Sequence, residues 1–268
     1  MVAATAHRAP FKPRGRRVFA RRGPSSLTDS FVRAFASVED TRNGIIGGLP
    51  MNPLSDFWQF LIGATDDYDA IGMWKYLFVA LFVALIVISV LIAVRTWRED
   101  PSQRTGRDLG MWLVRVLIGG MWFQGMLWKM PFPVSEGFEF WTQQIADRAA
   151  FGFLRELATE VYLPNLKILD PLVFLAELAF AVSLILGVGV RLVGVIGMIY
   201  VLHLWVGIYK PGDPAEWPWS YVFLAALMFL FALLAAGRNL GLDGWLRRHV
   251  PRVRDRNGAL GKFFHAVG

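Results

Sequence analysis

Three ionisable residues interrupt long apolar stretches of the sequence: Arg115, Glu177 and His203. An ionisable group within the hydrocarbon layer of a membrane costs at least about 2.5–3.5 kcal/mol on insertion scales, so each is a candidate functional residue. A carboxylate and an imidazole at one depth could hold a quinone carbonyl oxygen and handle its proton, with aromatic side chains as walls. The chemistry open to this set is therefore the binding and protonation of a small lipid-soluble ligand.

The sequence contains no cysteine and only four histidines, of which His203 alone lies within an apolar run. The lack of thiols excludes disulfides, thiolate iron–sulfur or zinc sites, covalent c-type haem and a cysteine nucleophile. One membrane-embedded histidine cannot form a bis-histidine haem site within the chain. We therefore expect no metal site and no covalently bound cofactor, and a bound quinone would depend on a partner protein for electrons.

The elements that must position these residues are membrane helices. The chain is 55% hydrophobic yet carries a net charge of +7, which is ordinary for a membrane protein with basic flanks. A hydrocarbon core of about 30 Å requires about 20 mostly apolar helical residues. Five stretches qualify, at residues 76–94, 109–128, 171–190, 192–209 and 219–236. The sequence thus predicts an all-α, polytopic membrane protein, with Pro171 in the first turn of the third helix.

Helix direction predicts which candidates share a depth. At a rise of about 1.5 Å per residue, Glu177 and His203 both fall in the outer half of the membrane and could face each other. Trp205 or Tyr209 would then supply an aromatic wall. Two interpretations remain open: a quinone-headgroup site, or a structural hydrogen bond that fixes helix packing.

Arg115 falls near the opposite, cytoplasmic end of its helix. Its natural partner is Asp243, which follows the last apolar stretch, and we predict that these two form a structural charge pair. Glycines in the apolar stretches, among them Gly119, Gly187 and Gly194, are expected to allow close helix contact rather than ligand approach.

The remaining segments differ in composition. Residues 1–42 carry nine basic and three acidic side chains and few apolar ones, so they cannot bury a core alone. Residues 130–170 carry apolar side chains at helical spacing and are predicted to form one or two short amphipathic helices ended by Pro164. The predicted organisation begins with a basic tail (1–42), which is disordered or bound to a partner, and a semi-apolar approach segment (43–75), whose residues 43–64 are surface-bound or re-entrant. An additional transmembrane helix (76–94) and a cytoplasmic loop (95–108) follow. The rest is a four-helix membrane domain (109–243) with an outer amphipathic segment (130–170), and a basic cytoplasmic tail (244–268).

Basic residues near the helix ends predict the orientation. Eleven lie in the 95–108 loop, at Arg191 and after the last helix, against six on the other side. The larger set belongs in the cytoplasm, which places the N-terminus outside and the C-terminus inside. We expect the bacterial inner membrane. A mitochondrial inner membrane is the alternative, because the tail is arginine-rich and free of acidic residues up to Asp29.

Residues 109–243 resemble the DoxX/DoxD family of small four-helix membrane proteins in the order and spacing of a set of charged, aromatic and glycine residues. These residues are Arg115, Gly119, Gly125, Lys129, Glu177, Gly187, Arg191, His203, Tyr221 and the closing GRNLGLD of 237–243. The resemblance covers about half of the chain. It implies a four-helix bundle with both ends in the cytoplasm, and a family whose members include a subunit of thiosulfate:quinone oxidoreductase.

Two functions remain open at this stage. The additional helix and long leader favour an accessory, non-catalytic subunit of a respiratory or photosynthetic membrane complex, with other subunits and anionic lipid as partners. The alternative is a quinone-linked oxidoreductase subunit, with Glu177, His203, Trp205 and Tyr209 at the quinone. Nucleic acid is not an expected partner, because the tail is predicted to lie outside the cell.

Overall fold

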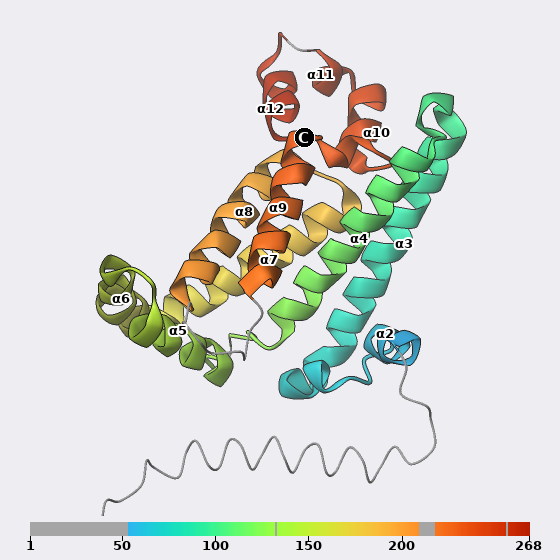
Figure 1. Cartoon of the computed structure of the whole chain (residues 1–268). Coiled ribbons are helices and arrows are strands. Elements are labelled where there is room, and N and C mark those ends of the chain that lie inside the picture. The colour runs from blue at the N-terminus through green and yellow to red at the C-terminus, as the bar shows by residue number, and fades with distance from the viewer. Residues whose placement is uncertain (1–52, 132, 209–217, 256) are drawn as a thin grey trace, which may run out of the picture. The chain divides into compact units, whose positions relative to one another are not determined.

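The computed structural model describes residues 53–131, 133–208, 218–255 and 257–268, which form one structural unit. All regular secondary structure in these residues is helical (Figure 1). The predicted 1–42 tail, the first ten residues of the approach segment and Tyr209 lie outside this description. The elements are α2 (Pro53–Leu61), η1 (Asp66–Trp74), α3 (Lys75–Glu99), η2 (Pro101–Gln103), α4 (Gly106–Leu127), α5 (Glu136–Arg148), α6 (Gly152–Leu157), η3 (Ala158–Tyr162), η4 (Leu163–Asn165), α7 (Leu166–Leu186), α8 (Val190–Gly207), α9 (Pro218–Leu233), η5 (Ala236–Arg238), α10 (Leu242–His249), α11 (Pro251–Arg254) and α12 (Ala259–Val267).

Three helical stretches in the described residues are long and apolar enough to span a membrane: Ile71–Glu99, Gly152–Leu186 and Val190–Gly207. Trp219–Leu233 is a shorter apolar helix. The predicted span at 109–128 corresponds to α4, which is 22 residues long but carries Arg115 and Gln124 among its apolar residues. The prediction of an all-helical chain is therefore confirmed for the described residues, with three helices whose length and composition suit a membrane.

Glycines set how closely the long helices pack. α4 lies along α7, and α8 lies along α9. A Cβ on Gly119 would lie 2.7 Å from Ile185 Cγ1, and one on Gly194 would lie 2.6 Å from the carbonyl oxygen of Met228. Neither position leaves room for a side chain, so these glycines permit the close helix contacts predicted for them.

Helix α3, predicted as an addition to a four-helix bundle, packs into the same core. The ring of Phe82 lies 4.8 Å from that of Phe123 on α4, and Phe78 lies 5.9 Å from Phe174 on α7. Further along α3, the Ser89 hydroxyl donates to the carbonyl oxygen of Ile185 at 2.6 Å. Aromatic packing and this hydrogen bond fix α3 against both neighbours.

The prolines of the outer segment do not end helices where the sequence predicted. The chain continues in helical form from α6 through a π turn (η3) and a 3-10 turn (η4), which contains Pro164, directly into α7. Pro171 consequently lies inside α7 and not in its first turn. A proline inside a helix removes one backbone hydrogen bond, which neighbouring helices can compensate in a membrane bundle.

Helices α10, α11 and α12 lie at the end of the bundle that holds the α3–α4 connection, and α5 and α6 lie at the opposite end (Figure 1). The backbone N–H of Leu240 donates to the Gln103 side-chain oxygen at 2.8 Å, and Arg248 forms an ion pair with Asp100. We call this the basic end, comprising residues 95–108, 187–191 and 236–268. The segments predicted to share the cytoplasmic side therefore gather at one end of the molecule.

A candidate ligand site at the Lys129–Glu177–Tyr200 cluster

Glu177 projects from α7 into the core, where its residue is only 2% exposed. Its carboxylate accepts a hydrogen bond from Lys129 Nζ to Oε2 at 2.6 Å and another from the Tyr200 hydroxyl to Oε1 at 2.7 Å. Lys129 follows the end of α4, and Tyr200 lies on α8. Residues from three parts of the chain thus satisfy one buried carboxylate, and we call them the Lys129–Glu177–Tyr200 cluster.

The Lys129 ammonium group is also largely buried and has a second acceptor. It donates to the backbone carbonyl of Gly125 at 2.8 Å, and it lies 4.0 Å from the centre of the Trp128 ring. An ammonium group carries three N–H donors, so two are used by Glu177 and Gly125. The third is available to the Trp128 ring or to a ligand.

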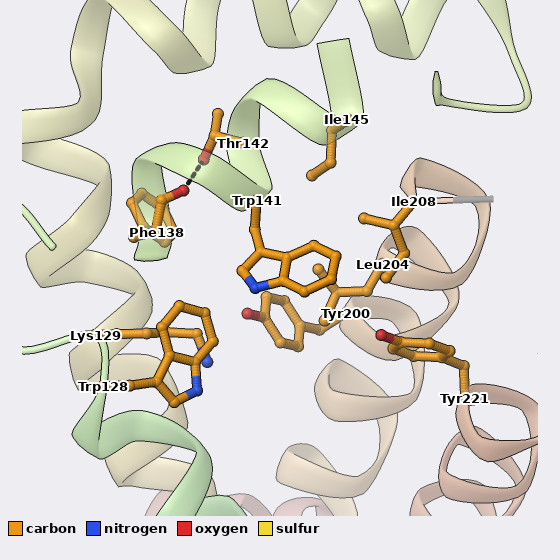
Figure 2. Close-up of a pocket in the computed structure, with 10 residues that line it drawn as sticks. All are labelled: Trp128, Lys129, Phe138, Trp141, Thr142, Ile145, Tyr200, Leu204, Ile208 and Tyr221. Carbon is orange, nitrogen blue, oxygen red and sulfur yellow. Dashed lines mark hydrogen bonds between the residues drawn. The ribbon is translucent and has the colours of Figure 1, made fainter. Parts of the chain in front are cut away.

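A cavity of about 310 Å³ lies directly beside the cluster. Figure 2 shows the rings of Trp128, Trp141, Tyr200 and Tyr221 arranged around it, with Lys129 next to Trp128. The full lining is Trp128, Lys129, Phe138, Trp141, Thr142, Ile145, Tyr200, Leu204, Ile208 and Tyr221. An apolar, aromatic cavity with a few convergent polar groups is the usual form of a small-molecule site. Helix α5 forms one of its walls, which assigns a role to the outer amphipathic segment.

The structure does not join Glu177 to His203. The imidazole of His203 is half-buried and packs edge-on against the Tyr162 ring, with centroids 5.9 Å apart. No hydrogen bond or ion pair links it to Glu177 within the described residues. Trp205 is half-buried, and neither it nor His203 lines the cavity. Of the four residues predicted at the ligand, Glu177 is the one in contact with the cavity's polar wall, and Tyr209 lies outside the described residues.

Lys129 and Tyr200 are the polar groups that sequence reasoning missed. From the sequence, Lys129 is named only among the residues that resemble the DoxX/DoxD family, and Tyr200 lies in an apolar run that does not single it out. A signal was nonetheless present, because Arg115, Gly119, Trp122 and Lys129 form one stripe of α4 and its end. The buried face of that stripe could have indicated that Lys129 also points inward.

Arg115 occupies a second buried polar site at the basic end, where it is 0% exposed. Its Nη1 donates to the carbonyl oxygen of Leu184 at 2.6 Å, and its guanidinium lies against Gly187 in the α7–α8 turn. Gly187 has φ +73°, and a Cβ there would lie 2.2 Å from Arg115 Nη1. The arginine therefore fills the space that a side chain at residue 187 would occupy.

Asp243 holds the other side of the same turn. Its Oδ1 accepts from the N–H of Gly189 at 3.0 Å, and its own backbone N–H donates to the carbonyl of Gly187 at 2.8 Å. Burial raises the pKa of Asp243, while the backbone N–H groups of Gly189 and Val190 and the charges of Arg115 and Arg247 oppose that rise. Arg115 and Asp243 attract each other across the turn, but no direct ion pair joins them among the described residues, so their structural role stays a prediction.

Fold and site together define a helical membrane protein with a buried ion pair beside an aromatic cavity. No protein-family model, curated protein or solved structure matches the chain. The resemblance to the DoxX/DoxD family therefore stays a prediction that rests on the residues themselves.

Proposed function

We propose that this protein binds the head ring of a quinone in the cavity beside the Lys129–Glu177–Tyr200 cluster, as a membrane subunit of a quinone-linked oxidoreductase. The observation that carries the proposal is a buried, hydrogen-bonded charge pair that borders an aromatic-walled cavity. Two charges are expensive to bury, and a hydrophobic pair of similar volume is often as stable or more so. A ligand that uses the pair gives a reason for its presence.

The cavity suits a flat ring that accepts hydrogen bonds. Its volume of about 310 Å³ is at the lower limit for ligand sites, which fits one head ring and not an isoprenoid tail as well. The walls offer aromatic faces for stacking, and Lys129 offers an N–H donor for a carbonyl oxygen. When bound, a quinone supplies the capacity to accept two electrons and two protons.

Each residue of the cluster has a distinct part in this proposal. Lys129 directs its third N–H to the ligand and, as a cation, favours negative charge developing there. Glu177 holds Lys129 in place and accepts a hydrogen bond from the Tyr200 hydroxyl. Tyr200 keeps its oxygen lone pairs for a ligand hydroxyl, and the rings of Trp128 and Trp141 keep water away from the charges.

The chain itself carries no thiol, so a partner protein delivers the electrons in this proposal. A DoxX/DoxD-type four-helix bundle with α3 added would then sit in the bacterial inner membrane with its basic end in the cytoplasm. The quinone site would lie on the outer side, close to α5 and α6. A mitochondrial inner membrane is the alternative location.

A second candidate function is the accessory subunit of a respiratory or photosynthetic complex. The observation in its favour is the rigid attachment of α3, which adds a fixed apolar face with Leu77, Val87 and Leu91 exposed. Such a face suits a neighbouring membrane subunit as well as lipid. Purification in mild detergent distinguishes the two functions: an accessory subunit co-purifies with a complex whose activity is unaffected by changes in the cluster.

Quinone binding by the purified full-length chain tests the primary proposal. We expect K129M and Y200F each to weaken the binding of a short-chain benzoquinone by about 10- to 100-fold, because each removes a buried polar contact. K167M and Y76F make the same replacements at exposed positions and should bind like the unchanged protein. Equilibrium titration, followed by tryptophan fluorescence, measures the affinity.

K129M leaves the Glu177 carboxylate buried without its cation, which could disturb folding and mimic a loss of binding. The variant K129M/E177L removes both charges and restores an apolar core. A folded K129M/E177L protein that binds the quinone as tightly as the unchanged chain would overturn the proposal.

A further inference from the structure

A second cavity, of about 460 Å³, lies at the basic end. It is lined by four permanently basic side chains, a histidine and an alanine, with no acidic side chain: Arg191, Arg238, Arg247, Lys262, His265 and Ala266. These residues come from the start of α8, from η5, and from α10 and α12. The cavity therefore collects positive charge from four parts of the chain.

An apolar groove of about 480 Å³ adjoins this cavity and shares Arg191 and Ala266 with it. Its remaining lining comes from α8, α9 and α12: Leu192, Val195, Phe229, Ala232, Leu233 and Val267. A cationic cavity thus leads into an apolar groove between two helices of the bundle. A basic surface next to an apolar one matches a lipid in which an anionic headgroup is joined to an acyl chain.

Two of the four cations that line the cavity, Arg238 and Arg247, are engaged by contacts within the chain. Arg238 and Arg247 each donate from Nη2 to the Gly268 backbone oxygen at 2.9 Å, which fixes the end of α12 against η5 and α10. Asp243 is 1% exposed, accepts from the backbone at the start of α8 and also interacts electrostatically with Arg247. Arg191 and Lys262 form no ion pair within the part of the chain that the structure describes.

Helix α12 has the character of a helix that lies in a membrane interface. Leu260 and Phe263 are 45% and 53% exposed, next to the exposed Lys262. A short amphipathic helix with such a surface buries its apolar side chains at the boundary between headgroups and acyl chains. The cavity and groove that α12 helps to line would then lie at headgroup depth.

We propose that this surface binds one anionic glycerophospholipid, with its phosphate in the basic cavity and an acyl chain in the groove between α8 and α9. Arg191 lines both surfaces and holds the phosphate where they meet. Basic pockets beside transmembrane helices on the cytoplasmic side are suited to such headgroups. The site is at the opposite end from the quinone site, so the two proposals stand or fall separately.

Native mass spectrometry of the full chain, released from nanodiscs, tests the proposal. In discs of phosphatidylcholine with a minority of phosphatidylglycerol, we expect one phosphatidylglycerol to remain bound to the unchanged protein. R191A/K262A should weaken this binding by roughly 10- to 30-fold, because two of the charges that face the cavity are removed. R107A/R254A removes two exposed basic side chains outside the cavity and should retain the lipid.

A second variant tests the groove. L192N/V195N keeps every charge but makes the acyl-chain wall polar, and it should also lose phosphatidylglycerol. Retention of the lipid by R191A/K262A would overturn the proposal. The proposal would also be overturned if millimolar inorganic phosphate displaced phosphatidylglycerol and L192N/V195N bound the lipid normally. In that case the site would bind a small anion and not a lipid. Thermal unfolding of each variant confirms that loss of lipid is not loss of fold.

Discussion

At the scale of single residues, the molecule places the buried carboxylates of Glu177 and Asp243 where side-chain and backbone donors satisfy them. Glu177 has two side-chain donors, and Asp243 accepts backbone N–H groups of the α7–α8 turn. Arg115 depends on a carbonyl oxygen and on the missing side chain of Gly187. Each charge is therefore tied to a specific local geometry, and that geometry can be tested by single substitutions.

The substitution G187A should destabilise the protein by about 2–5 kcal/mol. The added Cβ would collide with the Arg115 guanidinium, and the residue would also be strained at φ +73°. Gly189 provides a matched control, because it has φ +64° but nothing within 4 Å of an added Cβ. G189A should therefore show the backbone cost alone, about 1–2 kcal/mol. Thermal unfolding in detergent measures both, and equal losses would contradict the role given to Arg115.

At the scale of elements, close pairing of helices organises the bundle. α8 and α9 approach closely at Gly194, and α4 and α7 approach at Gly119. The close approach of α4 and α7 accompanies the contact between Lys129, just beyond α4, and Glu177 on α7. Helix spacing is thus a condition for the Lys129–Glu177–Tyr200 cluster.

The substitution G194A should push α8 away from α9, because its Cβ would lie 2.6 Å from the Met228 carbonyl oxygen. We expect a loss of about 1–3 kcal/mol in the free energy of unfolding. At Gly120 an added Cβ would lie 3.5 Å from Phe82, which is an ordinary contact. G120A should consequently be tolerated or slightly stabilising, since alanine favours a helix over glycine. A lower unfolding temperature for G120A than for G194A would be inconsistent with this packing.

At the scale of the whole molecule, the two ends differ in character. One end holds the basic cavity and helices α10, α11 and α12, and the other holds the aromatic cavity with α5 and α6. This polarity follows the distribution of basic residues along the sequence. It leads to a definite expectation for orientation in the membrane.

Because the chain has no cysteine, single introduced cysteines report on orientation without background. S102C lies in the α3–α4 connection at the basic end, and T159C lies in the π turn at the opposite end. A membrane-impermeant maleimide added to intact cells should label T159C and leave S102C unlabelled until the membrane is opened. The reverse pattern would invert the proposed orientation, and labelling of both would contradict the placement of the two ends on opposite sides.

The sequence by itself determined the helical class, the approximate extent of the long apolar helices and the gathering of basic segments at one end. These properties depend on local hydrophobicity and on charge, which can be read residue by residue. The sequence also placed Arg115 and Asp243 near the same end of the bundle, where their charges interact without a direct ion pair among the described residues.

The tertiary structure decided which side chains meet. Depth along a helix placed Glu177 level with His203, but the rotation of α8 turns Tyr200 toward Glu177 and leaves His203 against Tyr162. Glu177 forms its ion pair with Lys129, which lies beyond the end of α4. The chain also stays helical through η4, the turn that contains Pro164 and leads into α7. Which face of α8 turns toward Glu177, and how the chain passes Pro164, depend on the packing of the whole bundle and not on the local pattern of residues.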